Sequence, residues 1–234
     1  MAKEKKQKKK DGDEKSRAYR VIYAIFAGII GFLFQIRVIG GENEPDTGRF
    51  VVCANHTSAT DPIAICYAFR KHQVRFMAKK ELFSIPVLAQ LIRLLGAFPV
   101  DRGGSDVGAI RRSVDMVKEG KCMGIFPQGH RYPKVDPRTT KAKNGAALIA
   151  TRASADIVPA YIVRKNNKFR LFRRTYVIIG EKIPFEALGY NPEADGEYAR
   201  ITSMVFDRVC TLGEQFAEEK AKEKLQKKQK KSKK

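Results

Sequence analysis

The chain has 234 residues, enough for one folded domain with a substantial apolar core. It carries 46 Lys and Arg against 25 Asp and Glu, and the resulting net charge of +21 predicts an anionic partner such as a lipid surface or a nucleic acid. Its four widely spaced cysteines and three histidines disfavour a disulfide scaffold and a transition-metal site, so we expect no metal and a reducing, cytosolic environment.

Both ends of the chain are rich in lysine. Residues 1–20 contain nine Lys or Arg against four Asp or Glu, and residues 217–234 form a second Lys-rich run. Such low-complexity segments cannot bury apolar surface, so we predict a disordered tail at residues 1–20 and a disordered or frayed helical tail at residues 217–234. The folded domain is predicted to occupy residues 37–216.

Residues 21–36 form an uncharged apolar segment between Arg20 and Arg37. As a helix this segment would be about 24 Å long, shorter than the ~30 Å hydrocarbon core of a bilayer. We predict a membrane-associating helix that dips into one leaflet on the cytoplasmic face and is held at an anionic surface by its basic flanks. One alternative is an ordinary core helix. A signal peptide is disfavoured because residues 37–40 continue as a strand.

Beyond this segment, strand-like and helix-like runs alternate. Their spacing predicts a single α/β domain, a sandwich with a mainly parallel central sheet flanked by helices. The predicted strands are residues 37–40, 50–54, 74–78, 97–100, 121–126, 157–163 and 175–179. The predicted helices are residues 62–70, 86–95, 105–120 and 144–153, with a terminal helix after Asp195. The dinucleotide-binding, P-loop, serine-hydrolase and zincin motifs are absent from the sequence, so those functions lose their usual support.

A histidine and an aspartate follow the predicted strand 50–54, within the sequence Asn-His-Thr-Ser-Ala-Thr-Asp of residues 55–61. Pro62 at a first helical position would make Asp61 the helix cap, with an ionised carboxylate facing backbone N–H groups. The His56 imidazole could hydrogen-bond this carboxylate, which would make its other ring nitrogen a better general base. The alternative is a turn histidine beside a simple helix cap, and the seven residues alone favour it because His-x4-Asp is a loose pattern.

Four further stretches lie at predicted strand ends, where open α/β sheets place their sites. They are Phe-Met-Ala-Lys-Lys-Glu-Leu-Phe at 76–83, Gly-Ala-Phe-Pro-Val-Asp-Arg at 96–102, Ile-Phe-Pro-Gln-Gly-His-Arg at 125–131 and Ile-Val-Pro-Ala at 157–160. Together with the His-x4-Asp stretch, and in this order, they closely resemble the glycerolipid acyltransferase family, specifically lysophosphatidate acyltransferases. The resemblance extends from about residue 35 to residue 183 and reverses the balance in favour of a catalytic pair.

This resemblance implies transfer of a fatty acyl group from acyl-CoA or acyl carrier protein to the sn-2 hydroxyl of 1-acyl-sn-glycerol 3-phosphate, which forms phosphatidic acid. It implies that His56 is the general base and that Asp61 orients it. It also implies an acceptor site in which two arginines hold the phosphate and three further residues give the site its shape. These residues are Arg102 and Arg131, and Gln128, Gly129 and Pro159. No cofactor is implied, and each arginine could instead be a solvated loop charge.

The 125–131 stretch departs from the family pattern at two positions. Gln128 stands where the family usually carries Glu, and His130 where it carries Thr. Glutamine keeps the size of glutamate but cannot carry a negative charge, so the departure bears on the acceptor more than on the reaction.

Three rival functions follow from the sequence. An acyltransferase for another lysophospholipid is the closest, and a catalytically inactive membrane adaptor is possible only if Gln128 abolishes turnover. A nucleic-acid-binding protein is disfavoured because Trp is absent and no recognisable motif interleaves aromatic residues with the Lys runs.

Overall fold

The structure is a computed structural model, and it describes residues 17–101 and 107–232. Its centre is a seven-stranded sheet in the order β1-β7-β6-β2-β5-β3-β4, and every neighbouring pair is parallel except β6 with β7. The predicted α/β fold with a mainly parallel sheet is therefore confirmed. The strands are β1 (Ile36–Ile39), β2 (Phe50–Ala54), β3 (Arg75–Lys79), β4 (Phe98–Val100), β5 (Met123–Ile125), β6 (Asp156–Arg164) and β7 (Thr175–Ile179).

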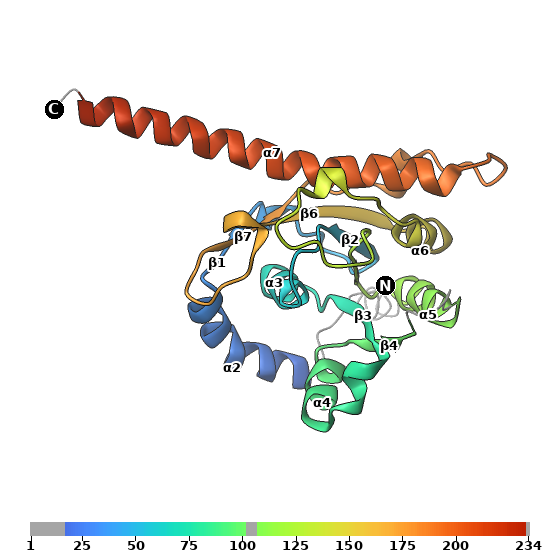
Figure 1. Ribbon diagram of the computed structural model, residues 1–234. Coiled ribbons are helices and arrows are strands. Elements are labelled where there is room, and N and C mark those ends of the chain that lie inside the picture. Colours follow the sequence, from blue (N-terminus) through green and yellow to red (C-terminus); the bar gives the residue numbers. More distant parts are fainter. Residues whose placement is uncertain (1–16, 102–106, 233–234) are drawn as a thin grey trace, which may run out of the picture.

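Helices cover both faces of this sheet. In Figure 1, α3 lies on one face, whereas α6 and the long α7 lie on the other. The helices are α2 (Arg17–Phe34), α3 (Asp61–Ala68), α4 (Pro86–Leu94), α5 (Val107–Lys118), α6 (Gly145–Ala153) and α7 (Glu197–Ser232). Five short 3-10 helices complete the described elements: η1 (Gly41–Asn43), η2 (Lys80–Ser84), η3 (Pro137–Thr139), η4 (Lys165–Asn167) and η5 (Phe185–Leu188).

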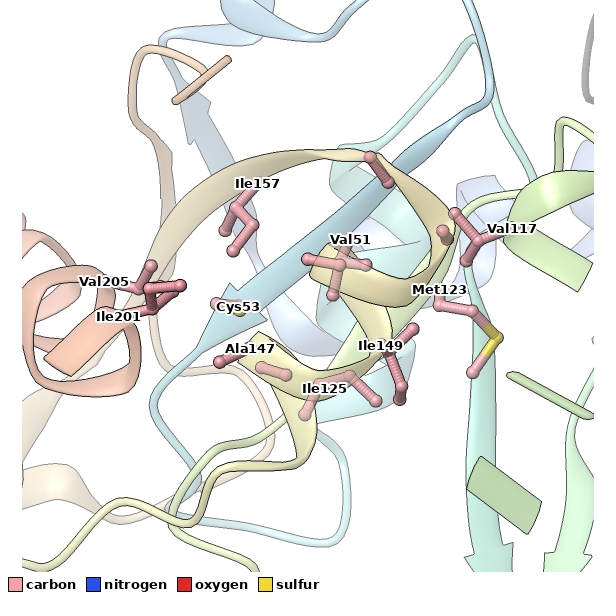
Figure 2. Close-up of a cluster of buried hydrophobic side chains, with 14 of the residues drawn as sticks. Val51, Cys53, Val117, Met123, Ile125, Ala147, Ile149, Ile157, Ile201 and Val205 are labelled. Carbon is pink, nitrogen blue, oxygen red and sulfur yellow. The ribbon is translucent and has the colours of Figure 1, made fainter. Parts of the chain in front are cut away.

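Strand β2 lies in the middle of the core, and all five of its residues are buried. Its side chains alternate between two apolar clusters, one on each face of the sheet. Val51 and Cys53 join the cluster drawn in Figure 2, which residues of α5, α6 and α7 complete. Burial on both faces explains why β2 is an unbroken apolar run in the sequence rather than an alternating one.

The segment predicted as a membrane-associating helix, residues 21–36, overlaps α2, which begins at Arg17 and ends at Phe34. Its contact with a membrane stays a prediction. Helix α2 packs on the domain, because Phe34 is buried in the cluster around α3 and the Tyr23 hydroxyl donates to the Tyr67 carbonyl at 3.0 Å. The side chains of Ile29 and Phe32 are nevertheless 51% and 70% exposed. No helix within the described ranges combines the length and apolar character needed to cross a membrane.

The structure describes little of the predicted N-terminal tail and most of the predicted C-terminal tail. Residues 1–16 lie outside the described residues. At the other end, α7 continues as an exposed helix through the Lys-rich run as far as Ser232, as Figure 1 shows where it extends beyond the sheet.

Candidate active site

The loop that carries the predicted catalytic pair leaves the carboxyl end of β2, between the ends of β6 and β5. Its first residue, Asn55, is fully buried. The Asn55 side chain donates to the Ile162 carbonyl at 3.1 Å and accepts from the Ile162 N–H at 2.7 Å. Asn55 thus extends the pairing of β2 with β6 beyond the strand, and it fixes where the loop begins.

His56 and Asp61 meet across this loop. The distance between His56 Nδ1 and Asp61 Oδ2 is 2.9 Å, and Asp61 is completely buried. The same oxygen accepts hydrogen bonds from the backbone N–H groups of Thr57 at 2.6 Å and Ser58 at 2.8 Å. The strand–loop–helix corner therefore brings together the two residues that the sequence pattern singled out.

The prediction that Asp61 is the helix cap was wrong. Thr60 precedes the first turn of α3 and Asp61 is its first residue. The carboxylate turns back toward the loop, where Thr57 and Ser58 supply N–H donors, instead of facing the N–H groups of the helix. These two donors and His56 occupy one carboxylate oxygen and leave the other for a partner from a different strand.

That partner is Arg164, the last residue of β6, which the sequence analysis did not identify. Its guanidinium donates to Asp61 Oδ1 and also to the Thr57 hydroxyl at 3.2 Å and the Thr60 hydroxyl at 3.3 Å. Only 2% of the Arg164 side chain is exposed. The available signal was a charge at the end of an apolar central strand, but five more Lys and Arg follow within residues 165–174 and obscure it.

The environment keeps Asp61 ionised. Burial alone would raise the pKa of this carboxyl, but the hydrogen bond from His56, together with the charge and hydrogen bond of Arg164, holds the pKa below its ordinary value. An ionised carboxylate accepts the proton on His56 Nδ1, which leaves Nε2 as the basic nitrogen. Within the described residues Nε2 has no hydrogen-bond partner.

The His56 ring stacks on Phe126, with ring centroids 4.1 Å apart and planes 11° from parallel, and Phe126 stacks on Phe76. The imidazole also borders a cavity of about 580 Å³. Half of the residues around this cavity have apolar side chains and three more are glycines; the polar and charged ones are His56, Asp101, His130, Lys143 and Arg152. The apolar residues are Phe76, Met77, Val100, Val107, Ile110, Ile125, Phe126 and Leu148. Such a cavity suits an acyl chain next to an anionic group.

Among the predicted acceptor residues that the structure describes, only Gly129 borders this cavity. Gly129 lines it with a left-handed φ of 70°, and a Cβ there would press against Lys143. Arg131 is exposed and makes no hydrogen bond or ion pair within the described residues. Pro159 is buried in β6 beside Cys53 and does not border the cavity. Arg102 lies outside the described residues.

Gln128 lies behind the catalytic loop and is 1% exposed. Its Oε1 accepts from the His56 N–H at 2.6 Å, and its Nε2 donates to the Thr140 hydroxyl at 2.8 Å. The Thr140 hydroxyl in turn donates to the Pro137 carbonyl at 2.6 Å. Gln128 therefore supports the backbone of the general base, and its amide matches an acceptor on one side and a donor on the other.

We expect Gln128→Ala to lower the free energy of unfolding by about 1–3 kcal/mol, because it leaves the buried His56 N–H without an acceptor. Gln128→Glu keeps that acceptor but turns a second oxygen toward Thr140, whose proton is already donated to Pro137. We therefore expect the Glu variant to be destabilised less than the Ala variant and to keep more of its kcat. Thermal melting and steady-state kinetics of both variants check this. Equal stability of Gln128→Ala and the parent would contradict the supporting role.

A second buried His–carboxylate pair, formed by His72 and Glu44, does not border this cavity. His72 Nδ1 lies 3.1 Å from Glu44 Oε1, and the Glu44 carboxylate also accepts from the N–H groups of Arg70, Lys71 and His72. His72 is 3% exposed and packs edge-on against Phe50. The pair organises the turn between α3 and β3, which lies at the opposite end of the strands from His56.

Comparison with known proteins places the chain among acyltransferases. A family model described as Acyltransferase matches residues 35–163. A 1-acyl-sn-glycerol-3-phosphate acyltransferase of Bacillus subtilis is 31% identical over 84% of this chain and 94% of the relative. One from Streptococcus pneumoniae is 35% identical over 60% of this chain and 53% of the relative. The crystal structure of PlsC, the 1-acyl-sn-glycerophosphate acyltransferase of Thermotoga maritima, shares the fold with a TM-score of 0.60, at 24% identity over 84% of this chain and 83% of PlsC.

Proposed function

Because this chain belongs to the Acyltransferase family, we propose that it transfers a fatty acyl group to the sn-2 hydroxyl of 1-acyl-sn-glycerol 3-phosphate and so forms phosphatidic acid. The proposed donor is acyl-CoA or acyl carrier protein. The names of the relatives from Bacillus and Streptococcus support the acceptor. The observation that carries the chemistry is His56, which borders the apolar cavity while Asp61 holds its Nδ1.

In the proposed reaction, His56 Nε2 removes the proton of the acceptor hydroxyl as its oxygen attacks the thioester carbonyl carbon. A positioned base of this kind contributes about 10²–10⁴ in rate. The buried Asp61 carboxylate stabilises the imidazolium that forms, without taking the proton itself. The imidazolium then gives its proton to the departing thiolate, and the site returns to its starting state.

Transfer is direct, without a covalent acyl-enzyme. Cys53 is the cysteine nearest in sequence to the pair, but it is fully buried in β2, and burial raises the pKa of its thiol to about 12. The Ser58 hydroxyl is engaged with Thr60 in the loop, at 3.0 Å. Neither residue is among the described residues that border the cavity.

Substrate binding divides between apolar and basic groups. We assign the acyl chains to the apolar wall of the cavity. The acceptor phosphate is assigned to Arg102 and Arg131, because a guanidinium donates two parallel hydrogen bonds to a phosphate. Lys143 and Arg152 border the cavity as well and add positive charge for the phosphate, against the single carboxylate of Asp101.

We expect Arg102→Ala and Arg131→Ala each to raise KM for lysophosphatidate about ten- to a hundredfold, the loss that follows from one charge-assisted hydrogen bond. KM for the thioester donor should change little, and Arg→Lys should restore binding only in part. Steady-state kinetics with each substrate varied in turn measure this, with Arg208→Ala on α7 as a control for an exposed cation. An unchanged acceptor KM in both variants would place the phosphate elsewhere.

The proposed acceptor is tested directly by acyl transfer over a panel of lysophospholipids with both thioester donors. The expected result is highest kcat/KM with lysophosphatidate. A higher value with another lysophospholipid would favour the rival acceptor, and no transfer to any would support the inactive adaptor. We place the protein at the cytoplasmic face of an anionic membrane, since both its acceptor and its product are lipids; its contact with an anionic lipid surface is tested below.

A further inference from the structure

The loop between β6 and β7, residues 165–174, lies at the same end of the strands as the catalytic pair. Strand β6 runs parallel to β2, so both strands end there, and β7 begins there because it is antiparallel to β6. Arg164, the residue before the loop, reaches Asp61. Anything that binds this loop is therefore held next to the active site.

The loop is strongly and uniformly basic. Residues 164–174 contain six Lys or Arg and no Asp or Glu. They surround a hollow of about 670 Å³, to which Lys134 adds another cation from outside the loop. Apart from Arg164, the loop cations make no ion pair with the described residues; they are Lys165, Lys168, Arg170, Arg173 and Arg174.

The tip of the loop is apolar and exposed. Leu171 is 52% exposed and Phe172 is 54% exposed. The Phe172 ring packs edge-on against Phe32 of α2, with centroids 5.8 Å apart. Phe32 is 70% exposed, and Ile29, one turn earlier on the same side of α2, is 51% exposed. Four large apolar side chains from two segments thus form one exposed patch beside the cations.

The backbone of the tip is held in an unfavourable conformation. Phe172 has a φ of 58°, in the left-handed region that a bulky residue rarely adopts. Its N–H donates to the Leu33 carbonyl at the end of α2, at 2.8 Å. This contact fixes the loop to the helix while the Phe172 side chain remains exposed. In water, both the strained backbone and the exposed ring are unfavourable in free energy.

We propose that this loop docks the domain on an anionic lipid leaflet. Leu171 and Phe172 enter the boundary between headgroups and acyl chains together with Ile29 and Phe32, and the cations around the hollow bind lipid phosphates. Exposed apolar tips flanked by unpaired cations fit such a surface, whereas a nucleic acid offers the apolar tip nothing to enter. The inference goes beyond the proposed reaction, because it assigns part of the membrane contact to the β6–β7 loop of the folded domain.

The absence of Trp from the chain allows a direct test of insertion. In the full-length protein, Leu171→Trp creates a single fluorophore at the tip. Its emission should shift to the blue with vesicles of phosphatidylcholine and phosphatidylglycerol, and brominated lipids should quench it. Ile39→Trp is the matched control. Ile39 is apolar and 40% exposed, and it lies at the opposite end of the strands from the β6–β7 loop, so the emission of this variant should not change. Equal responses from both, or none from Leu171→Trp while the protein floats with the vesicles, would overturn the proposal.

The role of charge is tested by replacing Arg170 and Arg173 together with Ala. Vesicle partitioning should fall about thirtyfold at low salt, since each cation near an anionic surface contributes about 1 kcal/mol. Replacing two exposed cations of α5, Arg111 and Lys118, should leave partitioning nearly unchanged. A similar loss in both pairs, or binding of the loop to duplex DNA in preference to vesicles, would overturn the lipid assignment. Transfer to a water-soluble short-chain lysophosphatidate without vesicles should survive in both pairs, so failure of docking is distinguishable from failure of the reaction.

Discussion

Replacing His56 with Ala is expected to lower kcat by about 10²–10⁴, the contribution of a positioned general base, while the protein stays folded. Folding should survive because Asp61 keeps the N–H donors of Thr57 and Ser58 and its partner Arg164. Asp61→Asn should produce a comparable loss, and the double variant should be little worse than either single one, because both residues serve one step. Steady-state kinetics and circular dichroism of the three variants measure these effects.

His72→Ala supplies the control for this experiment. Like His56, His72 is a buried histidine paired with a carboxylate, but it lies at the opposite end of the strands. Its replacement should lower stability and leave kcat nearly unchanged. Retention of more than about a tenth of the activity in His56→Ala is less loss than removal of a general base implies and would refute the assignment. A large loss of kcat in His72→Ala would show that activity responds to destabilisation alone.

Arg164→Met is expected to lower kcat by about 10²-fold with a smaller change in KM, because Arg164 touches Asp61 and not the substrate cavity. Without the guanidinium, one Asp61 oxygen loses its partner and the carboxylate can rotate away from His56. The same change should destabilise the protein by about 3–5 kcal/mol, the cost of breaking a buried ion pair on one side. Arg164→Lys should restore part of kcat, since it returns the charge without the fork of donors.

A stability cycle with Asp61→Asn keeps this prediction testable if Arg164→Met folds poorly. The double variant buries neither charge, so it should be less destabilised than the sum of the two single variants. Arg208→Met, at an exposed arginine of α7, serves as the control and should change neither kcat nor stability. Strict additivity of Arg164→Met with Asp61→Asn would show that the two side chains do not act as a pair.

The pH dependence of Asp61 follows from the same contacts. Because its folded pKa lies below its ordinary value, the carboxylate contributes stability above the unfolded pKa, and this contribution is lost as the pH falls through the folded pKa. Removal of Arg164 takes away one cause of the lowered pKa. Acid unfolding of Arg164→Met should therefore begin at a higher pH than that of the parent protein, which a titration followed by circular dichroism would measure.

The sequence alone predicts several strands of this fold and the pairing of His56 with Asp61, because both depend on residues close together in the chain. The strands at residues 50–54 and 175–179 have the predicted bounds, since apolar runs bounded by turn residues carry that information within a few positions. The His56–Asp61 pair was also predicted, because five residues across a strand–helix corner leave few ways to arrange two side chains. Residues 35–163, the span of the family match, contain the pair and the four stretches that follow it in order.

Tertiary structure alone decided how the pair is held. Arg164 lies 103 residues from Asp61 and Gln128 lies 72 residues from His56, and no periodic pattern links positions so distant. Their contacts arise because β6 and β5 flank β2 in the sheet, so that the ends of three strands far apart in the sequence meet at one edge. The orientation of the Asp61 carboxylate follows from the same neighbours. A sequence predicts which groups are present near a strand end, whereas strand order determines which of them come into contact.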